Sequence, residues 1–281
     1  MTVRIITDST SDIPSEIAKR LGVTVIAQNV HFGEQTYKDN VTITPDDFYS
    51  MLASSAELPK TSQASPGDFK ELYDELGDDA EGIVSVHVSA KLSGTVNSAV
   101  QGAALTSTDR PIEVIDSQQV SMGLGLNAIK AGEAAHRGAS LDEIVSATRD
   151  SIERTRCLCL FETLEYLQKG GRIGKAQALL GSLLSIKPII AIRDGEVQPL
   201  SKARTFPKAL ERMKQEARAF GPFEALAVMH STTPDLARQV ADDLGDALAD
   251  GAEPYVTQFG PALGVHAGPG AIGIALIQAA T

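Results

Sequence analysis

A buried strand that ends in a hydroxyl-rich turn, with a helix directly after it, constrains the fold of this chain more than any other stretch. The strand is expected at residues 83–88 and the turn at 89–92, and the helix opens on Ser93-Gly94-Thr95. In parallel α/β proteins this junction leaves backbone N–H groups of the helix free to meet an anionic ligand group. We interpret it as the centre of a ligand site. The alternative, that Ser93 only caps the helix, stays open because serine is a favoured N-cap residue.

The rest of the N-terminal half also alternates strands and helices. A predicted strand at residues 3–7 is followed by a polar loop, a helix ending at Gly22 and a strand at residues 23–27. A β-loop-α-β opening of this kind favours a doubly wound parallel sheet. The further elements expected in this half are helices beginning at Pro45 and Pro66, a strand at 112–115, and helices at 121–137 and 141–154.

The pattern changes after residue 155, where we place a boundary between two α/β domains, residues 1–155 and 156–281. A chain of 281 residues is longer than a single hydrophobic core usually supports. Asp194-Gly195 separates two apolar runs, which is a strong hairpin signal, so we expect a mixed sheet in the second domain. Its predicted strands are 157–161, 186–192, 196–200, 226–230, 255–259 and 271–277, and its predicted helices are 163–168, 175–184, 205–220 and 233–248.

Charge is distributed unevenly along this acidic chain, whose net charge is −11. Residues 156–218 hold 12 Lys and Arg against 6 Asp and Glu, so the remainder is strongly acidic. An acidic body argues against general nucleic-acid binding, which needs a broad basic surface. The basic segment indicates an anionic ligand or partner, although such charges also occur on solvated faces. Its candidate residues are Lys169, Arg172, Lys175, Lys202 and Arg204.

The N-terminus and the two cysteines favour a cytoplasmic protein without a metal site. Charged side chains recur through the first twenty residues, which excludes the apolar segment of a signal peptide. The longest apolar stretch, residues 179–192, is interrupted by polar residues and is too short to cross a bilayer. Cys157 and Cys159 lie in a strand-like run without a neighbouring His or further Cys. This spacing favours small buried hydrophobic side chains over a disulfide or a zinc site.

No nucleotide-binding motif organises the chain. Two matches to G-x-G-x-x-G/A, at residues 123–128 and 268–273, lack the βαβ surroundings that dinucleotide binding needs. The remaining candidates are hydroxyls and one histidine near glycines. Thr61, Ser93 and His266 are able to hydrogen-bond a carboxylate or phosphate, and Arg172 is able to neutralise one. His266 lies between glycines, where we expect neither a helix nor a packed core, although an isolated histidine is often structural.

Six short motifs, in order along the chain, resemble the DegV family of fatty-acid-binding proteins. They are residues 7–12 (TDSTSD), 61–63 (TSQ), 91–95 (KLSGT), 115–117 (IDS), 170–173 (GGRI) and 260–266 (GPALGVH). The resemblance runs over nearly the whole chain. Ala64 departs from the proline that related sequences often carry there, which we expect to stiffen the turn less without touching the polar contacts.

The resemblance implies two α/β domains with a long-chain fatty acid bound between them and no further cofactor. The carboxylate of the fatty acid would be held by the counterparts of Thr61, Ser93 and His266. Further candidates for this contact are Ser62, Gly94 and Thr95.

The resemblance also implies that the chain has no catalytic residue of its own. In the family, a separate ATP-dependent fatty acid kinase subunit phosphorylates the carboxyl group, and the acyl phosphate feeds phospholipid synthesis. Arg172, Lys202 and Arg204 are then candidates for docking the kinase or screening the phosphate charge. Any contact with a membrane surface is expected to be transient.

Two other functions stay open. An acyl hydrolase would use Ser93 as its nucleophile and His87 or His266 as its base, but a sequence does not give the distances between them. A regulatory module would sense acyl chains and act through a partner other than a kinase. The hydroxyl cluster and the missing nucleotide motif favour a lipid-binding carrier.

Overall fold

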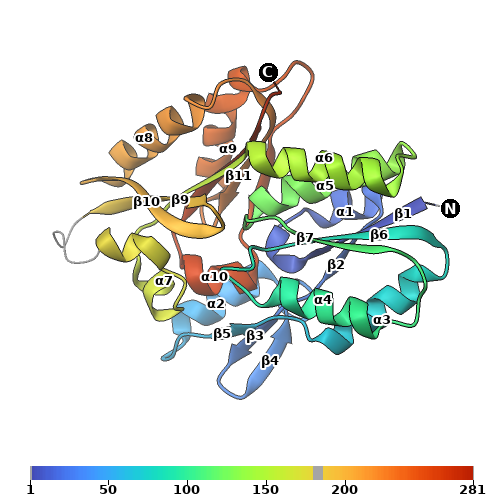
Figure 1. The fold of residues 1–281 in the computed structure, drawn as a ribbon. Coiled ribbons are helices and arrows are strands. Elements are labelled where there is room, and N and C mark those ends of the chain that lie inside the picture. The colour runs from blue at the N-terminus through green and yellow to red at the C-terminus, as the bar shows by residue number, and fades with distance from the viewer. Residues whose placement is uncertain (1, 180–185, 281) are drawn as a thin grey trace.

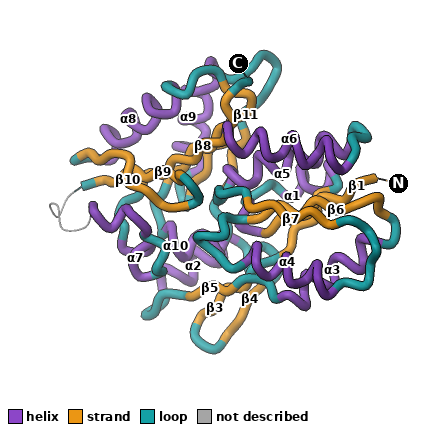
Figure 2. The backbone as a smooth tube through the Cα atoms, viewed as in Figure 1, coloured by secondary structure: helices purple, strands orange, loops and turns teal. Residues whose placement is uncertain are grey.

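The computed structural model describes residues 2–179 and 186–280 and contains two α/β domains (Figure 1). One domain is built on a four-stranded sheet and the other on a six-stranded sheet, and a small three-stranded sheet completes the structure. Figure 2 shows helices around and between the two larger sheets. The predicted α/β class and the two-domain organisation are therefore confirmed. The boundary that we predicted between residues 155 and 156 falls at the start of strand β8 and remains our proposal.

The first sheet is parallel and has the strand order β2-β1-β6-β7. Its strands are β1 (Thr2–Asp8), β2 (Val23–Ile26), β6 (Ala80–His87) and β7 (Ile112–Asp116). Helices α3 (Pro66–Gly77) and α4 (Thr95–Leu105) pack on one face, and α1 (Ser15–Leu21), α5 (Met122–His136) and α6 (Leu141–Arg154) pack on the other. The predicted doubly wound parallel sheet is thus confirmed. Because β1 and β6 are parallel neighbours, the polar segments that follow them lie side by side at the carboxyl ends of the strands.

The second sheet is mixed and has the order β10-β9-β8-β13-β11-β12, in which only β11 and β12 are parallel. Its strands are β8 (Thr155–Leu160), β9 (Lys187–Arg193), β10 (Glu196–Ala203), β11 (Phe223–His230), β12 (Tyr255–Gln258) and β13 (Ile272–Gln278). Helices α8 (Phe206–Arg218) and α9 (Pro234–Leu244) cover its outer face. Asp194 and Gly195 have φ angles of 52° and 76°, as a tight hairpin turn requires, so the predicted β9–β10 hairpin is confirmed.

Helix α5 lies between the two larger sheets and joins their cores. Met122, Leu126 and Ile129 pack against the second sheet, whereas Leu124 and Ala128 pack against the first. A helix that is apolar on all sides is buried on all sides, and α5 is apolar or small at almost every position. Its first residue therefore lies where the two domains meet.

The small sheet has the antiparallel order β4-β3-β5 and was not predicted from the sequence. Its strands are β3 (Asn29–Phe32), β4 (Gln35–Lys38) and β5 (Lys60–Ser62). Helices α2 (Pro45–Ser54) and α10 (Pro261–Ala267) lie next to it, and Val30, Phe48 and Val265 share one core cluster. This cluster fixes a segment from the end of the chain against the N-terminal half.

Several helix ends follow the predicted signals. Ser65 caps α3 through a capping box with Asp68, and Pro66 occupies the first turn. The helix predicted at 163–168 forms as α7 (Glu165–Lys169), and the one predicted at 233–248 ends with α9 at Leu244 before a 3-10 turn, η3 (Gly245–Ala247). The helix predicted at 175–184 is wrong in its first part, which is a 3-10 helix, η2 (Gly174–Leu179). Its remainder, residues 180–184, lies outside the described residues.

Among the residues that the structure describes, no helix combines the length and the apolar character needed to cross a membrane.

Candidate functional site

A cavity of about 910 Å³, counting the space at its mouth, lies between the two domains. Most of the side chains that line it are apolar. The polar lining residues are Thr10, Gln28, Thr61, Ser62, Gln63, Ser93, Ser121, Arg172 and His266.

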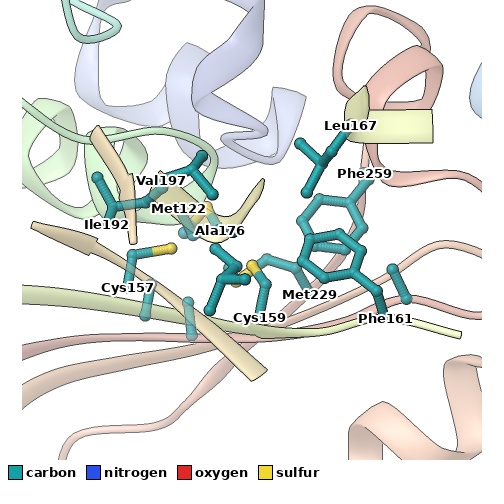
Figure 3. Close-up of a cluster of buried hydrophobic side chains, with 14 of the residues drawn as sticks. Met122, Cys157, Cys159, Phe161, Leu167, Ala176, Ile192, Val197, Met229 and Phe259 are labelled. Carbon is teal, nitrogen blue, oxygen red and sulfur yellow. The ribbon is translucent and has the colours of Figure 1, made fainter. Parts of the chain in front are cut away.

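The apolar wall is the inner face of β8, β9 and β10. Antiparallel pairing places Cys159 opposite Ile190 and Ile192 opposite Val197, so these four side chains share one face. Figure 3 shows Cys159, Ile192 and Val197 within the surrounding buried cluster. Both cysteines are free and buried, which confirms their prediction as small buried side chains. A wall of this composition favours an apolar chain that makes no hydrogen bonds.

The predicted head-group residues come from three separate elements and line the same cavity. Thr61 lies on β5, Ser93 on the turn before α4, and His266 on α10. The Thr61 hydroxyl lies 3.3 Å from His266 Nε2. The Ser93 and Thr95 hydroxyls are 2.8 Å apart, and Gln28 donates a hydrogen bond to the second of them. The structure therefore brings Thr61, Ser93 and His266 together at one cavity.

His266 lies in a helix, so our expectation of a non-helical glycine-rich segment was wrong. The glycines around it serve the helix ends and its packing. Gly260 is the N-cap, and Gly268 ends the helix with a φ of 67°. A Cβ on Gly264 would lie 2.4 Å from Phe48 Cε1, so close packing against α2 excludes a side chain there. Pro261 lies in the first turn of the helix, where proline is favoured, and our sequence analysis did not consider this signal.

The His266 ring is neutral and presents one nitrogen to the cavity. Burial, reinforced by the nearby positive charge of Arg172, lowers the pKa of His266 to about 4. Its Nδ1 atom is buried and has no hydrogen-bond partner among the described residues. A buried N–H without an acceptor is rarer than a buried nitrogen lone pair without a donor. We therefore infer that Nδ1 carries the lone pair and that the ring proton is on Nε2, beside Thr61. His266 is then a hydrogen-bond donor at the cavity wall.

Arg172 is the one member of the predicted basic set Arg172, Lys202 and Arg204 that lines the cavity. Its guanidinium donates hydrogen bonds to the carbonyl oxygens of Leu92, at 3.3 Å, and Gly170, at 2.8 Å. These contacts join the glycine-rich turn of the second domain to the turn before α4. Lys202 and Arg204 are exposed on and just after β10 and are not among the residues that line the cavity.

Three buried aspartates lie behind the polar wall: Asp8, Asp12 and Asp39. Asp12 accepts a 2.8 Å hydrogen bond from the Gly260 N–H, and burial raises its pKa well above the ordinary value. Burial also raises the pKa of Asp39 to about 6, although hydrogen bonds from Ser9 and from the backbone N–H of Ala262 act to lower it. Two of these carboxyl groups therefore hold the first turn of α10.

Ser121, the residue before α5, has a strained backbone with φ of 52° and ψ of −143°. A non-glycine residue in this region costs on the order of 1–3 kcal/mol. Its side chain does not cap α5 and instead donates a 2.5 Å hydrogen bond to Asp12. Neither Ser121 nor Asp12 was predicted as part of the site.

The family model described as "Uncharacterised protein, DegV family" matches residues 2–279. The chain belongs to the DegV family. A DegV domain-containing protein of Streptomyces coelicolor is 37% identical over 275 residues, which cover 97% of both chains.

Solved DegV structures share the fold over the whole chain. One is a fatty-acid-binding DegV family protein from Thermus thermophilus, with a TM-score of 0.90 and 32% identity. The match covers 99% of this chain and 100% of that chain. A stearic acid-binding protein of Eubacterium ventriosum has a TM-score of 0.90 and 25% identity, with 98% of each chain covered. DegV structures similar to this chain thus include proteins that bind fatty acids.

The geometry of this DegV protein gives no support to a hydrolase. The Ser93 hydroxyl is bonded to Thr95, and no hydrogen bond joins it to a histidine within residues 2–179 and 186–280. The lowered pKa of His266 makes that ring a weak base near neutral pH. His87 is fully buried, where its Nδ1 lies 3.0 Å from Asp8 and its Nε2 lies 2.6 Å from Ser85.

Ala64 makes a polar contact that our reading of the sequence had excluded. Its backbone N–H donates a 3.0 Å hydrogen bond to Gln28 Oε1, and the same Gln28 side chain donates to Thr95. A proline at this position has no N–H and would break the link. The difference from proline therefore does touch the polar contacts around the cavity.

Proposed function

We propose that this DegV protein binds one long-chain fatty acid in the cavity and holds its carboxylate at Thr61, Ser93 and His266. The cavity carries the proposal, because an apolar wall and a group of hydroxyl and imidazole donors line the same space. Ser62 lines the same cavity, whereas Gly94 and Thr95, the other predicted contacts, follow Ser93 at the start of α4 and are not among the lining residues. The N-terminus of α4, which begins at Thr95, adds a favourable electrostatic field for an anion.

The apolar tail supplies most of the affinity in this proposal. Burial of about fourteen methylene groups at about 0.8 kcal/mol each gives on the order of 10 kcal/mol, before the costs of association and ordering. The hydroxyls and His266 chiefly offset the desolvation of the carboxylate. They therefore set the orientation of the ligand and contribute less to its affinity than the tail does, although the loss of any one of them leaves the carboxylate poorly satisfied.

The first experiment is mass spectrometry of an organic extract from natively purified protein. A long-chain fatty acid in near-stoichiometric amount is the expected result. The same extract from a Cys159→Phe variant, whose ring would project into the cavity, should be depleted. Protein that extracts without fatty acid, and stays empty after incubation with octadecanoic acid, would contradict the proposal.

We also propose that the bound fatty acid is presented to a separate ATP-dependent fatty acid kinase subunit. Two features support this: the described site residues form no catalytic constellation, and Arg172 brings a positive charge to the head-group region. Arg172, Lys202 and Arg204 would dock the kinase or screen the growing phosphate charge, and the acyl phosphate would feed phospholipid synthesis.

The kinase proposal is tested with labelled fatty acid, Mg-ATP and a kinase fraction from the host cell. Acyl phosphate trapped by hydroxylamine is the expected product. Arg204→Glu should reduce its formation by about tenfold while fatty acid binding is unchanged, because Arg204 does not line the cavity. Equal product with and without the DegV protein would overturn the presentation role.

A further inference from the structure

Ser121 places a second polar position on the cavity wall, apart from the head-group residues. Its side chain is buried, with 1% exposure, and lines the cavity. The neighbouring lining residues Val120 and Phe259 are apolar. A buried hydroxyl on an apolar wall is the kind of group that fixes the chemistry of a ligand.

The rise of helix α10 sets the scale of the separation between the two polar positions. Asp12, the partner of Ser121, binds the Gly260 N–H at the start of the helix, and His266 lies six residues further on. Six residues of α-helix span about 9 Å. Because Ala262, Leu263 and Ala267 also line the cavity, the cavity runs along this helix.

The separation corresponds to the middle of a long acyl chain. An extended carbon chain advances about 1.25 Å per bond, so about 9 Å is roughly seven bonds from the carboxyl carbon. The reach of one hydrogen bond, about 2.8 Å, extends the position to about the eighth to tenth carbon.

The Ser121 hydroxyl has unused hydrogen-bonding capacity. A hydroxyl has one donor and two acceptor positions, and Asp12 is its only side-chain partner among the described residues. If the Asp12 carboxylate accepts the serine proton, a lone pair is left for the cavity. If a protonated Asp12 donates instead, the serine proton is left for the cavity. A ligand hydroxyl fits either arrangement because it both donates and accepts.

We infer that the cavity accepts long-chain fatty acids that carry a hydroxyl group near the middle of the chain, with Ser121 as the hydrogen-bond partner of that hydroxyl. The inference rests on the proposed fatty acid binding and adds a class of ligand to it. The strained backbone of Ser121 supports this inference. Its side chain binds Asp12 at the cavity wall instead of capping the N-terminus of α5.

The test compares the Kd values of octadecanoic acid, 10-hydroxyoctadecanoic acid and 2-hydroxyoctadecanoic acid by competition with a fluorescent fatty acid. Ser121→Ala removes the hydroxyl, and Ser121→Gly removes it while also accepting the positive φ, so that a folding defect is excluded. Ser54→Ala is the matched control, because its exposed hydroxyl bonds only to the backbone of its own helix.

We expect wild-type protein to bind the 10-hydroxy acid within about fivefold of octadecanoic acid. Both Ser121 variants should weaken the 10-hydroxy acid by about tenfold or more, because its hydroxyl is left buried without a partner. The Kd values of octadecanoic acid and the 2-hydroxy acid should change together and much less, so the ratio of the 10-hydroxy Kd to the octadecanoic Kd carries the result; Ser54→Ala should change none of them.

If the ratio of the 10-hydroxy Kd to the octadecanoic Kd is unchanged in both Ser121 variants, and octadecanoic acid still binds, this inference is overturned. The proposed function would then still stand. Failure of all three acids to bind wild-type protein would overturn both.

Discussion

Gly170→Ala is expected to weaken fatty acid binding by displacing the His266 ring, without removing any polar group. Gly170 has φ of −75° and ψ of −7°, a conformation that alanine adopts freely. A Cβ there would lie 2.3 Å from His266 Nδ1 and 3.0 Å from the Tyr166 carbonyl oxygen. The ring must then move by more than about 1 Å to reach an ordinary contact of about 3.5 Å. His266 would lose its position beside Thr61.

The size of the effect follows from the hydrogen bond that His266 offers to the carboxylate. Hydrogen bonds to charged groups contribute about 1.5–3 kcal/mol, which corresponds to about a 10- to 150-fold increase in Kd. Competition with a fluorescent fatty acid measures this change. Gly245→Ala is the matched control, because Gly245 is also right-handed, with φ of −60°, and a Cβ there meets nothing within 4 Å.

A double-mutant cycle separates this mechanism from a general loss of stability. His266→Ala removes the ring that the new methyl group would strike, so adding Gly170→Ala should then cost almost nothing. Unchanged binding in Gly170→Ala alone would refute the reasoning. So would an equal loss of affinity with and without the His266 ring.

Three further predictions concern the cavity wall and the residues behind it. Cys159→Phe should raise the Kd for octadecanoic acid at least tenfold, because the larger side chain takes up space in the cavity. Cys159→Ala should change this Kd less than about threefold. Competition with a fluorescent fatty acid measures both values. Because the pKa of Asp39 is raised to about 6, the folded protein keeps a proton that the unfolded chain releases. The free energy of unfolding should therefore fall by up to about 3 kcal/mol as the pH rises from about 4 to about 6. Urea unfolding at several pH values should show this decrease in the free energy of unfolding. The decrease should be smaller in Asp39→Asn, whose side chain does not titrate. Ala64→Pro removes the N–H that binds Gln28, and we expect about 1 kcal/mol lower stability by the same assay, with part of the loss offset by a stiffer unfolded chain.

The strand-to-helix junctions were predictable from sequence because they combine several local signals. The run before Ser93 is apolar, the turn is polar, and the helix begins at once, so fold class and site location agree. Parallel pairing of β1 with β6 then brings the segment after Asp8 to the same sheet edge. That step follows from the predicted topology and would have added Thr10 to the candidates.

Apart from the local signal of Pro261, the remaining errors came from interactions between segments far apart in sequence. The helix around His266 exists because Asp12 and Asp39 satisfy its first backbone N–H groups and because Gly264 allows contact with Phe48. Each of these partners is more than 200 positions away in sequence. The small sheet was missed for a similar reason, since three short polar strands show little periodicity until they pair.

The two ends of α10 link recognition of the ligand to the buried carboxyl groups. Helix α10 has only seven residues, so a shift of its first turn moves His266 almost as a rigid body. Asp12 and Asp39 hold that first turn from the N-terminal domain, and His266 reaches Thr61 from the other end. The same Asp12 also positions Ser121. Asp12 is therefore placed to set both His266, the proposed head-group donor, and Ser121, the proposed partner of a mid-chain hydroxyl, which accounts for a buried carboxyl group directly behind the cavity wall.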